Sequence, residues 1–299
     1  MNIPLKEEQI KAGRIAAEVR NEVKKRVYVG MRLLDLCELV ERMIKDRGGE
    51  PAFPCNVCVN HVAAHYTPTI DDESIIQDGD VVKIDIGAHI QGHIADTATT
   101  VSFNPKFDGM VQAVEEVLQE VIKVARAGVR VGELGRIVAE GAHKRGFKPI
   151  SNLSGHSIEP YKIHAGLSIP NVWVPSSSSL KLGSIYAIEP FLTTMDGAGV
   201  VVNGSTTNIY SLITRKKTDD KELNAFIDTI WAKWRTLPFT PRYFKDTVNK
   251  KDLDSMLSRL VKMKILRAYP ILIEANGRCV VQAEHTIMPM EGGVIILTQ

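Results

Sequence analysis

Two aspartates occupy apolar, β-branched surroundings between Val81 and Phe103, in the run VVKIDIGAHIQGHIADTATTVSF. The run is typical of an antiparallel hairpin, and a turn at Ile90 and Gln91 would place Asp85 directly opposite Asp96. Two facing carboxylates repel each other, so the pair is costly unless a positive charge lies between them. A single Asp in a strand is usually a solvated edge residue. A facing pair instead favours a bound metal ion.

Further residues of metal-ligand type lie elsewhere in the chain, and two of them, Glu189 and Glu284, interrupt apolar runs. Taken one at a time, each could be a hydrogen-bonded structural residue or the partner of a lysine. Together, four carboxylates on apolar strands would need four separate countercharges, whereas one dinuclear metal centre satisfies them all. Four carboxylates and one imidazole suit Mn, Fe, Co or Zn, and two such ions can activate water and polarise a carbonyl. The set is Asp85, Asp96, His156, Glu189 and Glu284, with His65 and His164 in NHVAAHYTP and GHSIEPYKIH.

Composition limits the class of protein. The chain has 299 residues, 44% of them hydrophobic, and a formal net charge of +2. This near-balance gives no reason to expect specific nucleic-acid binding or membrane binding. The polar N-terminus carries no secretory signal and no apolar run could span a bilayer, so we expect a cytoplasmic monomer. Cys55 and Cys58 form a lone CxxC, for which half-buried strand residues are favoured over a redox pair or a zinc site.

The elements that must position these residues repeat along the chain. Residues 5–27 and 109–127 show the apolar spacing of amphipathic helices, and a shorter helix follows each. A shift of 98 positions superposes Gly30 on Gly128, and Arg47-Gly48 at the end of one predicted helix on Arg145-Gly146 at the end of the other. We infer two related halves, although two amphipathic helices can also match by chance. Two such halves predict a pseudo-twofold α+β unit, with helices covering a curved sheet and a site in the cleft between the halves.

A different pattern begins beyond Val201. Residues 211–269 are charged and amphipathic with helical spacing, which predicts a compact, mainly helical insertion. Strands return in a hairpin around Asn276 and Gly277, a favoured turn dipeptide. The predicted organisation is therefore a catalytic unit of residues 1–210 plus 270–299, interrupted by an insertion of residues 211–269.

Four segments, DIG…IADTATT, GHSIEPYKIHAG, AIEPF and AEHTI, resemble those of the pita-bread metallopeptidases. Within that family the chain is most similar to the type 2 methionine aminopeptidases in their short archaeal form, over nearly its whole length. The resemblance implies the duplicated pita-bread fold, with the winged-helix-like insertion that separates type 2 from type 1 enzymes. It also implies two divalent metal ions per chain, drawn from Co, Mn, Fe, Zn and Ni.

The resemblance implies a role for each candidate ligand. Asp85 would chelate one metal ion, while Asp96 and Glu284 would bridge both ions. His156 and Glu189 would bind the other ion, and Glu189 would also take a proton from the attacking water.

The resemblance further implies residues that meet the substrate. His65 and His164 would flank the scissile peptide, binding it and stabilising the tetrahedral intermediate. Phe53 would form a wall of the methionine pocket, with Ile163 and Tyr269 as further candidates. The Asn-Ile-Tyr segment at Asn208 departs from family members that carry a histidine before the tyrosine.

The implied activity is removal of the initiator methionine from nascent polypeptide N-termini when the second residue is small. The basic surface of the insertion makes the ribosome a candidate docking partner. One alternative is an Xaa-Pro peptidase of the same fold, a class that usually carries a different N-terminal domain. The other is a non-catalytic pita-bread binding protein, a class that loses metal ligands, whereas this chain keeps all five.

Overall fold

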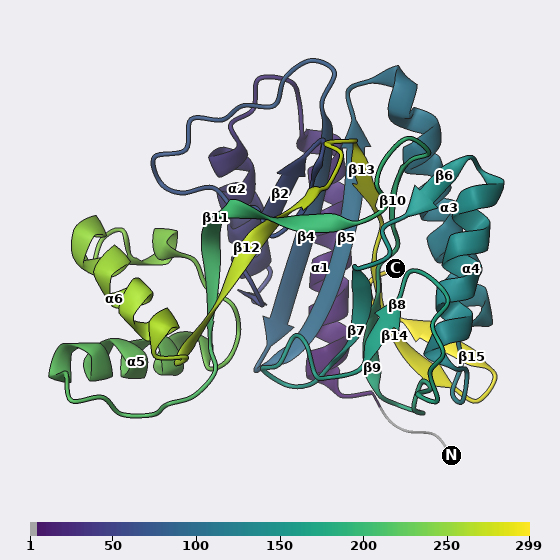
Figure 1. The fold of residues 1–299 in the computed structure, drawn as a ribbon. Helices are drawn as coiled ribbons and strands as arrows, with labels where there is room; N and C mark the ends of the chain where they lie inside the picture. Colours follow the sequence, from purple (N-terminus) through teal and green to yellow (C-terminus); the bar gives the residue numbers. More distant parts are fainter. Residues whose placement is uncertain (1–4) are drawn as a thin grey trace.

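The computed structural model describes residues 5–299, so the first four residues of the predicted catalytic unit lie outside it (Figure 1). Two helices precede a small sheet in the first half of the molecule. Apolar side chains recur at helical spacing in both helices and face the sheet. The elements are α1 (Glu7–Arg26), α2 (Leu33–Asp46), β1 (Glu50–Pro51), β2 (Asn56–Val59), β3 (Val62–Ala64), β4 (Val81–Ile90) and β5 (His93–Ser102).

The second half repeats this order and is interrupted by the insertion. Its first elements are η1 (Pro105–Phe107), α3 (Asp108–Val124), α4 (Val131–Lys144), β6 (Phe147–Pro149), β7 (Ser154–Ile158), β8 (Ser168–Pro170), β9 (Ile185–Ile188) and β10 (Phe191–Thr194). Then come β11 (Val201–Leu212), α5 (Lys221–Trp234), η2 (Pro241–Phe244), α6 (Lys250–Lys262) and β12 (Leu266–Glu274). The chain ends with β13 (Val280–Gln282), β14 (His285–Met290) and β15 (Gly293–Ile296).

The predicted internal repeat is present in the structure. The helices α2 and α4 begin at Leu33 and Val131 and have 14 residues each, at the offset of 98 positions seen in the sequence. The loops before them contain Gly30 and Gly128, with φ of 95° and 86°. Even the ion pairs at the helix ends repeat at this offset: they are Arg47 with Glu18 and Glu22, and Arg145 with Glu116 and Glu120.

Each half has its own apolar core between helices and sheet. In the first half, α1 and α2 pack against β4 through a cluster that includes Ile15, Leu36 and Ile84. In the second half, α3 and α4 pack against the strands through a cluster that includes Val117, Leu134 and Tyr186. A five-stranded sheet in the order β15-β14-β9-β7-β8 and the four-stranded sheet of β1, β2, β4 and β5 then meet near the middle of the molecule.

The hairpin of β4 and β5 has a register that differs from the predicted one. Gly87 lies opposite Asp96, and Asp85 lies opposite Ala98, so the two aspartates are diagonal neighbours. The turn falls on Gln91 and Gly92, whose φ values of 49° and 88° fit the positive-φ turns that match strand twist. The prediction of directly opposed carboxylates is therefore wrong by two residues. Both aspartates still share one face, because side chains alternate with a period of two.

The insertion lies at one end of the molecule, on the left in Figure 1, where the paired strands β11 and β12 lead into it. Its two helices and η2 enclose a separate apolar cluster that includes Phe226, Phe239, Phe244 and Leu257. In the part of the chain that the structure describes, none of the helices combines the length and the apolar character required to cross a membrane.

Candidate metal centre

Asp96 and its neighbour Thr97 are hydrogen-bonded to a strand segment from the other half. The backbone N–H of Asp96 donates to Thr286 Oγ1 and its carbonyl accepts from the same hydroxyl, both at 2.7 Å. The Thr97 hydroxyl donates to the carbonyl oxygen of Glu284 at 2.8 Å. These bonds place β5 beside the segment that carries Glu284, and so bring Asp96 and Glu284 together.

The other ligand candidates lie on neighbouring strands of the five-stranded sheet. His156 in β7 pairs with Ala187 in β9, and Ile188 at the end of β9 pairs with His285 at the start of β14. Glu189 follows β9 directly and Glu284 precedes β14 directly. Three neighbouring inner strands of the sheet therefore bring the imidazole and both glutamates close together.

The distances join these side chains into one cluster. His156 Nε2 lies 3.6 Å from Asp96 Oδ2 and 3.5 Å from Glu189 Oε1. Ligand atoms of Asp96, His156 and Glu284 all lie within 4.8 Å of one another, close enough to hold one ion. Asp85 is near enough for its charge to raise the pKa values of Asp96, Glu189 and Glu284.

If fully ionised, the cluster would carry more negative charge than its own residues can balance. Burial raises the pKa of Asp85 to about 7. Burial, with mutual repulsion, also raises the pKa values of Asp96, Glu189 and Glu284. Burial lowers the pKa of His156, and neighbouring His164 lowers it further, so this imidazole is neutral at pH 7 and supplies no positive charge.

Several oxygens of the cluster also have no hydrogen-bond partner. Among residues 5–299, Asp85 Oδ1, Asp96 Oδ1 and Glu284 Oε1 are buried and unpaired. An unpaired buried carboxylate oxygen loses its hydration without replacement, at a cost of about 1–3 kcal/mol or more. An oxygen-rich donor set with one neutral imidazole fits a hard or borderline divalent cation. The residues present therefore fit the metal that the sequence predicts.

One cavity of about 470 Å³ joins the cluster to the predicted substrate-binding residues. It is lined by all five candidate ligands and also by Phe53, His65, Ile163, His164 and Tyr269. The structure thus brings together every site residue that the sequence predicts.

The two histidines of the cavity outside the ligand set, His65 and His164, are neutral at pH 7. Burial lowers the pKa of His65, and burial lowers that of His164 to about 4, with smaller contributions from nearby His65 and Arg267. His65 also has a φ of 65°, an uncommon conformation for a residue with a side chain, and its Nδ1 lies 3.3 Å from the Pro270 carbonyl oxygen. Such strained residues persist only where the surroundings hold them firmly.

Several residues of the site escaped prediction, among them Asn56, Gln282 and Ile209. Asn56 lies opposite Asp85 in the β2–β4 pair and lines the cavity. Gln282 Nε2 lies 3.4 Å from both Glu189 Oε2 and Glu284 Oε2. The sequence could have indicated Gln282, because this residue precedes Glu284 by two positions in an extended segment and therefore lies on the same face. Ile209 also lines the cavity.

The remaining residues of sequence interest lie away from the chemistry. Asn208 donates to the Thr67 carbonyl oxygen, and Tyr210 packs on Phe239 in the insertion. Cys55 and Cys58 are free thiols that are completely buried rather than half-buried. Burial raises the pKa of Cys58 to about 12, which argues against a reactive redox pair.

Comparison with known proteins agrees with this geometry. Residues 7–209 match the model of metallopeptidase family M24. A methionine aminopeptidase of Methanocaldococcus jannaschii is 42% identical over 300 residues, with 100% of both chains covered. One of Saccharolobus solfataricus is 42% identical over 293 residues, covering 96% of each. The crystal structure of a methionine aminopeptidase from Thermotoga maritima has the same fold, with a TM-score of 0.71 at 24% identity over 100% of this chain and 99% of that one. Because the family model spans more than half of the chain and the relatives match it from end to end, the chain belongs to metallopeptidase family M24.

Proposed function

We propose that this protein is a metal-dependent aminopeptidase that removes methionine from the N-termini of polypeptides. The observation that carries the proposal is a single cavity in which an uncompensated carboxylate cluster meets two neutral histidines and an apolar wall. The full-length relatives that bear the name methionine aminopeptidase support it. We extend it to substrates whose second residue is small, as in nascent chains that leave the ribosome.

Five residues would hold the metal. Asp85, Asp96, His156, Glu189 and Glu284 would provide enough oxygen and nitrogen donors for two divalent ions, and the carboxylates of Asp96 and Glu284 would be shared between the ions. When bound, such ions polarise the substrate carbonyl and lower the pKa of the attacking water.

Glu189 is the candidate proton carrier. Burial raises its pKa well above that of an ordinary glutamate, which brings its affinity for a proton closer to neutral pH. The amide of Gln282 contacts Glu189 Oε2 at 3.4 Å and would hold the carboxylate in place. In this position Glu189 accepts a proton from the attacking water and returns it to the leaving amine.

The two histidines would contact the peptide in different ways. A carbonyl oxygen only accepts hydrogen bonds, so neutral His65 directs its Nδ1–H to Pro270 and keeps Nε2 as an acceptor for a substrate N–H. The ring of His164 lies 4.4 Å from that of His156, measured between centroids. This position near the ligand cluster makes His164 the candidate donor to the carbonyl oxygen as negative charge develops there.

Apolar side chains would receive the methionine side chain. Phe53 and Ile163 are 8% and 6% exposed, and Tyr269 lines the same cavity. Gly87 makes room for this wall, because a Cβ there would lie 2.2 Å from the Phe53 ring. An unbranched, flexible thioether fits a narrow apolar pocket of this kind.

The insertion is proposed to span residues 211–269, with residues 1–210 and 270–299 forming the catalytic unit. Its separate apolar cluster, which includes Phe226 and Leu257, supports this division.

Hydrolysis of short peptides by the purified protein tests the proposal. With Mn²⁺ or Co²⁺ added, Met-Ala-Ser should lose its first residue, whereas Met-Pro and other Xaa-Pro dipeptides should be cleaved far more slowly. Metal analysis of the same sample should find divalent metal bound. Faster cleavage of Xaa-Pro dipeptides would favour the proline-specific alternative. A protein that binds no divalent ion at micromolar concentration would favour the non-catalytic one.

A further inference from the structure

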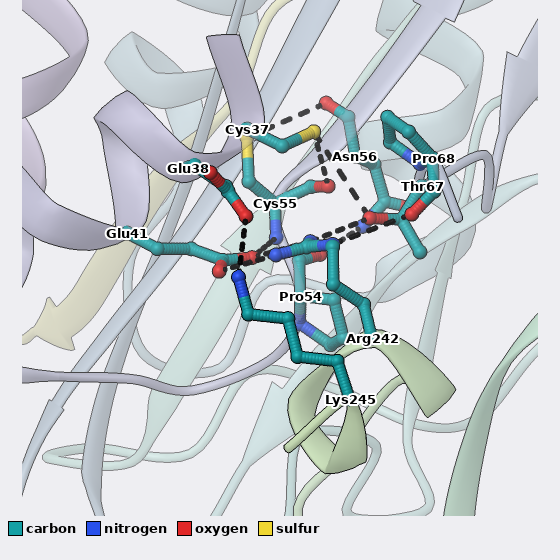
Figure 2. A network of polar contacts seen from close by, with 10 residues as sticks. All are labelled: Cys37, Glu38, Glu41, Pro54, Cys55, Asn56, Thr67, Pro68, Arg242 and Lys245. Atoms are coloured by element: carbon teal, nitrogen blue, oxygen red, sulfur yellow. Dashed lines mark hydrogen bonds and ion pairs between the residues drawn. The ribbon is translucent and has the colours of Figure 1, made fainter. Parts of the chain in front are cut away.

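A buried ion pair joins the insertion to the first half of the molecule, as Figure 2 shows. Arg242 in η2 donates from Nη1 to Glu41 Oε2 at 2.8 Å and from Nη2 to Glu41 Oε1 at 2.9 Å. The two side chains are only 3% and 7% exposed. Burial alone would lower the pKa of Arg242, but the hydrogen bonds and charge of Glu41 raise it above its ordinary value. The pair is therefore charged and bidentate.

The same two side chains hold two further segments of the chain. Arg242 Nη2 donates to Thr67 Oγ1 at 3.2 Å, and Arg242 Nε donates to the Pro68 carbonyl oxygen at 3.3 Å. Glu41 Oε1 accepts the backbone N–H of Cys55 at 3.2 Å. In Figure 2 these partners surround the guanidinium group from separate strands and loops. The pair therefore acts as a junction of α2, the insertion and two segments that lead into the cavity.

Both segments end at walls of the cavity. Cys55 lies between Phe53 and Asn56, and both of these residues line the cavity. Thr67 follows His65 by two residues, and His65 lines the cavity in its strained conformation. Small displacements of Cys55 and Thr67 would thus move a pocket wall and a substrate-binding imidazole.

We propose that Arg242 is a positioning residue through which the insertion sets the methionine pocket and His65. This inference rests on the proposed function. It gives a functional reason for an ion pair in a place where apolar side chains of similar volume could often give equal or greater stability. It makes the selectivity for the first residue of the peptide depend on a contact outside the cavity.

The test compares two substrates in each variant. The ratio of kcat/KM for Met-Ala-Ser to that for Leu-Ala-Ser does not depend on how much of the enzyme is folded. A merely structural role would lower both values equally and leave the ratio unchanged. A positioning role lowers the ratio, because a displaced pocket wall loses its fit to the unbranched side chain.

The main variant is the double substitution Glu41→Leu with Arg242→Met, which removes both charges and retains apolar volume. We expect kcat/KM for Met-Ala-Ser to fall about 10- to 100-fold, as for misplaced binding groups, and the ratio to fall about tenfold. Metal content should stay unchanged, because no ligand candidate is altered. Arg242→Lys keeps the charge but cannot make the forked contacts, so it should also lower the ratio.

A neighbouring surface ion pair provides the matched control. Lys245 Nζ lies 3.7 Å from Glu38 Oε1 across the same interface, with both side chains more than 40% exposed. Lys245→Met should leave the ratio unchanged. If the double variant fails to fold, the substrate ratio measured for Arg242→Lys decides whether Arg242 has the positioning role.

The outcomes separate the two proposals. A wild-type enzyme that cleaves no methionine peptide contradicts the proposed function itself. A wild-type enzyme that cleaves Met-Ala-Ser, together with folded variants that keep its substrate ratio, overturns the positioning role of Arg242 alone.

Discussion

Two buried groups of charged side chains in this molecule balance their charge in opposite ways. The ligand cluster around Asp96 holds four carboxylates and a neutral imidazole, and three of its oxygens have no partner within residues 5–299. In the junction of Glu41 and Arg242, both carboxylate oxygens accept and all three guanidinium nitrogens donate. Asp96, His156 and Glu284 of the cluster and both residues of the junction are buried, whereas Asp85 and Glu189 are partly exposed.

The difference shows what buried charge means for function. The junction compensates its own charges, so the fold is sufficient to hold it. The ligand cluster has no countercharge among its own residues, so a cation from solution would compensate it. Unpaired carboxylate oxygens, rather than burial or acidity alone, therefore distinguish the ligand cluster from the junction.

The largest expected effect concerns the uncompensated cluster. Asp96→Ala removes a proposed bridging ligand, so kcat/KM for Met-Ala-Ser should fall by at least about 1,000-fold, the scale on which catalytic groups act. Metal analysis should show reduced binding, while the exposed Asp78→Ala serves as the control. Retained activity in Asp96→Ala would remove the basis for a shared metal site.

Removing only the arginine of the Glu41–Arg242 pair should destabilise the folded protein. Arg242→Ala leaves the Glu41 carboxylate buried without its countercharge, so the free energy of unfolding should fall by about 3–5 kcal/mol. Urea denaturation measures this loss. Adding Glu41→Leu should recover a large part of it. A loss below 1 kcal/mol in the single variant would show that the pair does not stabilise the contact between the insertion and the first half.

Metal removal should act on the ligand cluster alone. At a free metal concentration of 100 times Kd, binding stabilises the folded state by about 2.7 kcal/mol, and a chelator should remove that amount. Thermal unfolding with and without chelator measures the shift. Asp96→Ala should lose most of the shift and Lys245→Met should keep it. Equal shifts in both variants would place the bound metal elsewhere.

The smallest effect should come from the exposed pair of Lys245 and Glu38. Surface ion pairs contribute about 0–1 kcal/mol, so Lys245→Met should change the free energy of unfolding within that range. A loss comparable to that of Arg242→Ala would show that the whole interface, and not the buried pair, holds the insertion.

The carboxylates among the proposed metal ligands could be singled out from the sequence because they interrupt apolar runs, whereas His156 stands in a mixed segment and was assigned through the family resemblance. A glutamate such as Glu284 on an apolar strand is conspicuous, and the segment around it matches a known motif. The repeat was visible because Gly30 and Gly128 occupy equivalent positive-φ positions. The apolar pattern did not determine the register of the hairpin, because a shift of two residues leaves Asp85 and Asp96 on the same face.

Other parts of the site depend on contacts that no local pattern reveals. Glu41 and Arg242 are 201 residues apart, and each resembles an ordinary surface charge of an amphipathic segment. Irregular pairing between Thr207 and Ile209 alters the alternation of β11, and Ile209 lines the cavity. Such features follow from tertiary packing, and the local sequence pattern does not indicate them.

The division of the ligands between the two halves has a topological consequence. A metal ion held by the proposed ligands would cross-link the chain, because it would close a loop that runs from Asp85 to Glu284. A cross-link over so long a loop restricts the unfolded ensemble more than a short one does. It would also limit separation of the two sheets in the folded state. The bound metal would then hold the two halves of the fold together without any covalent bond between them.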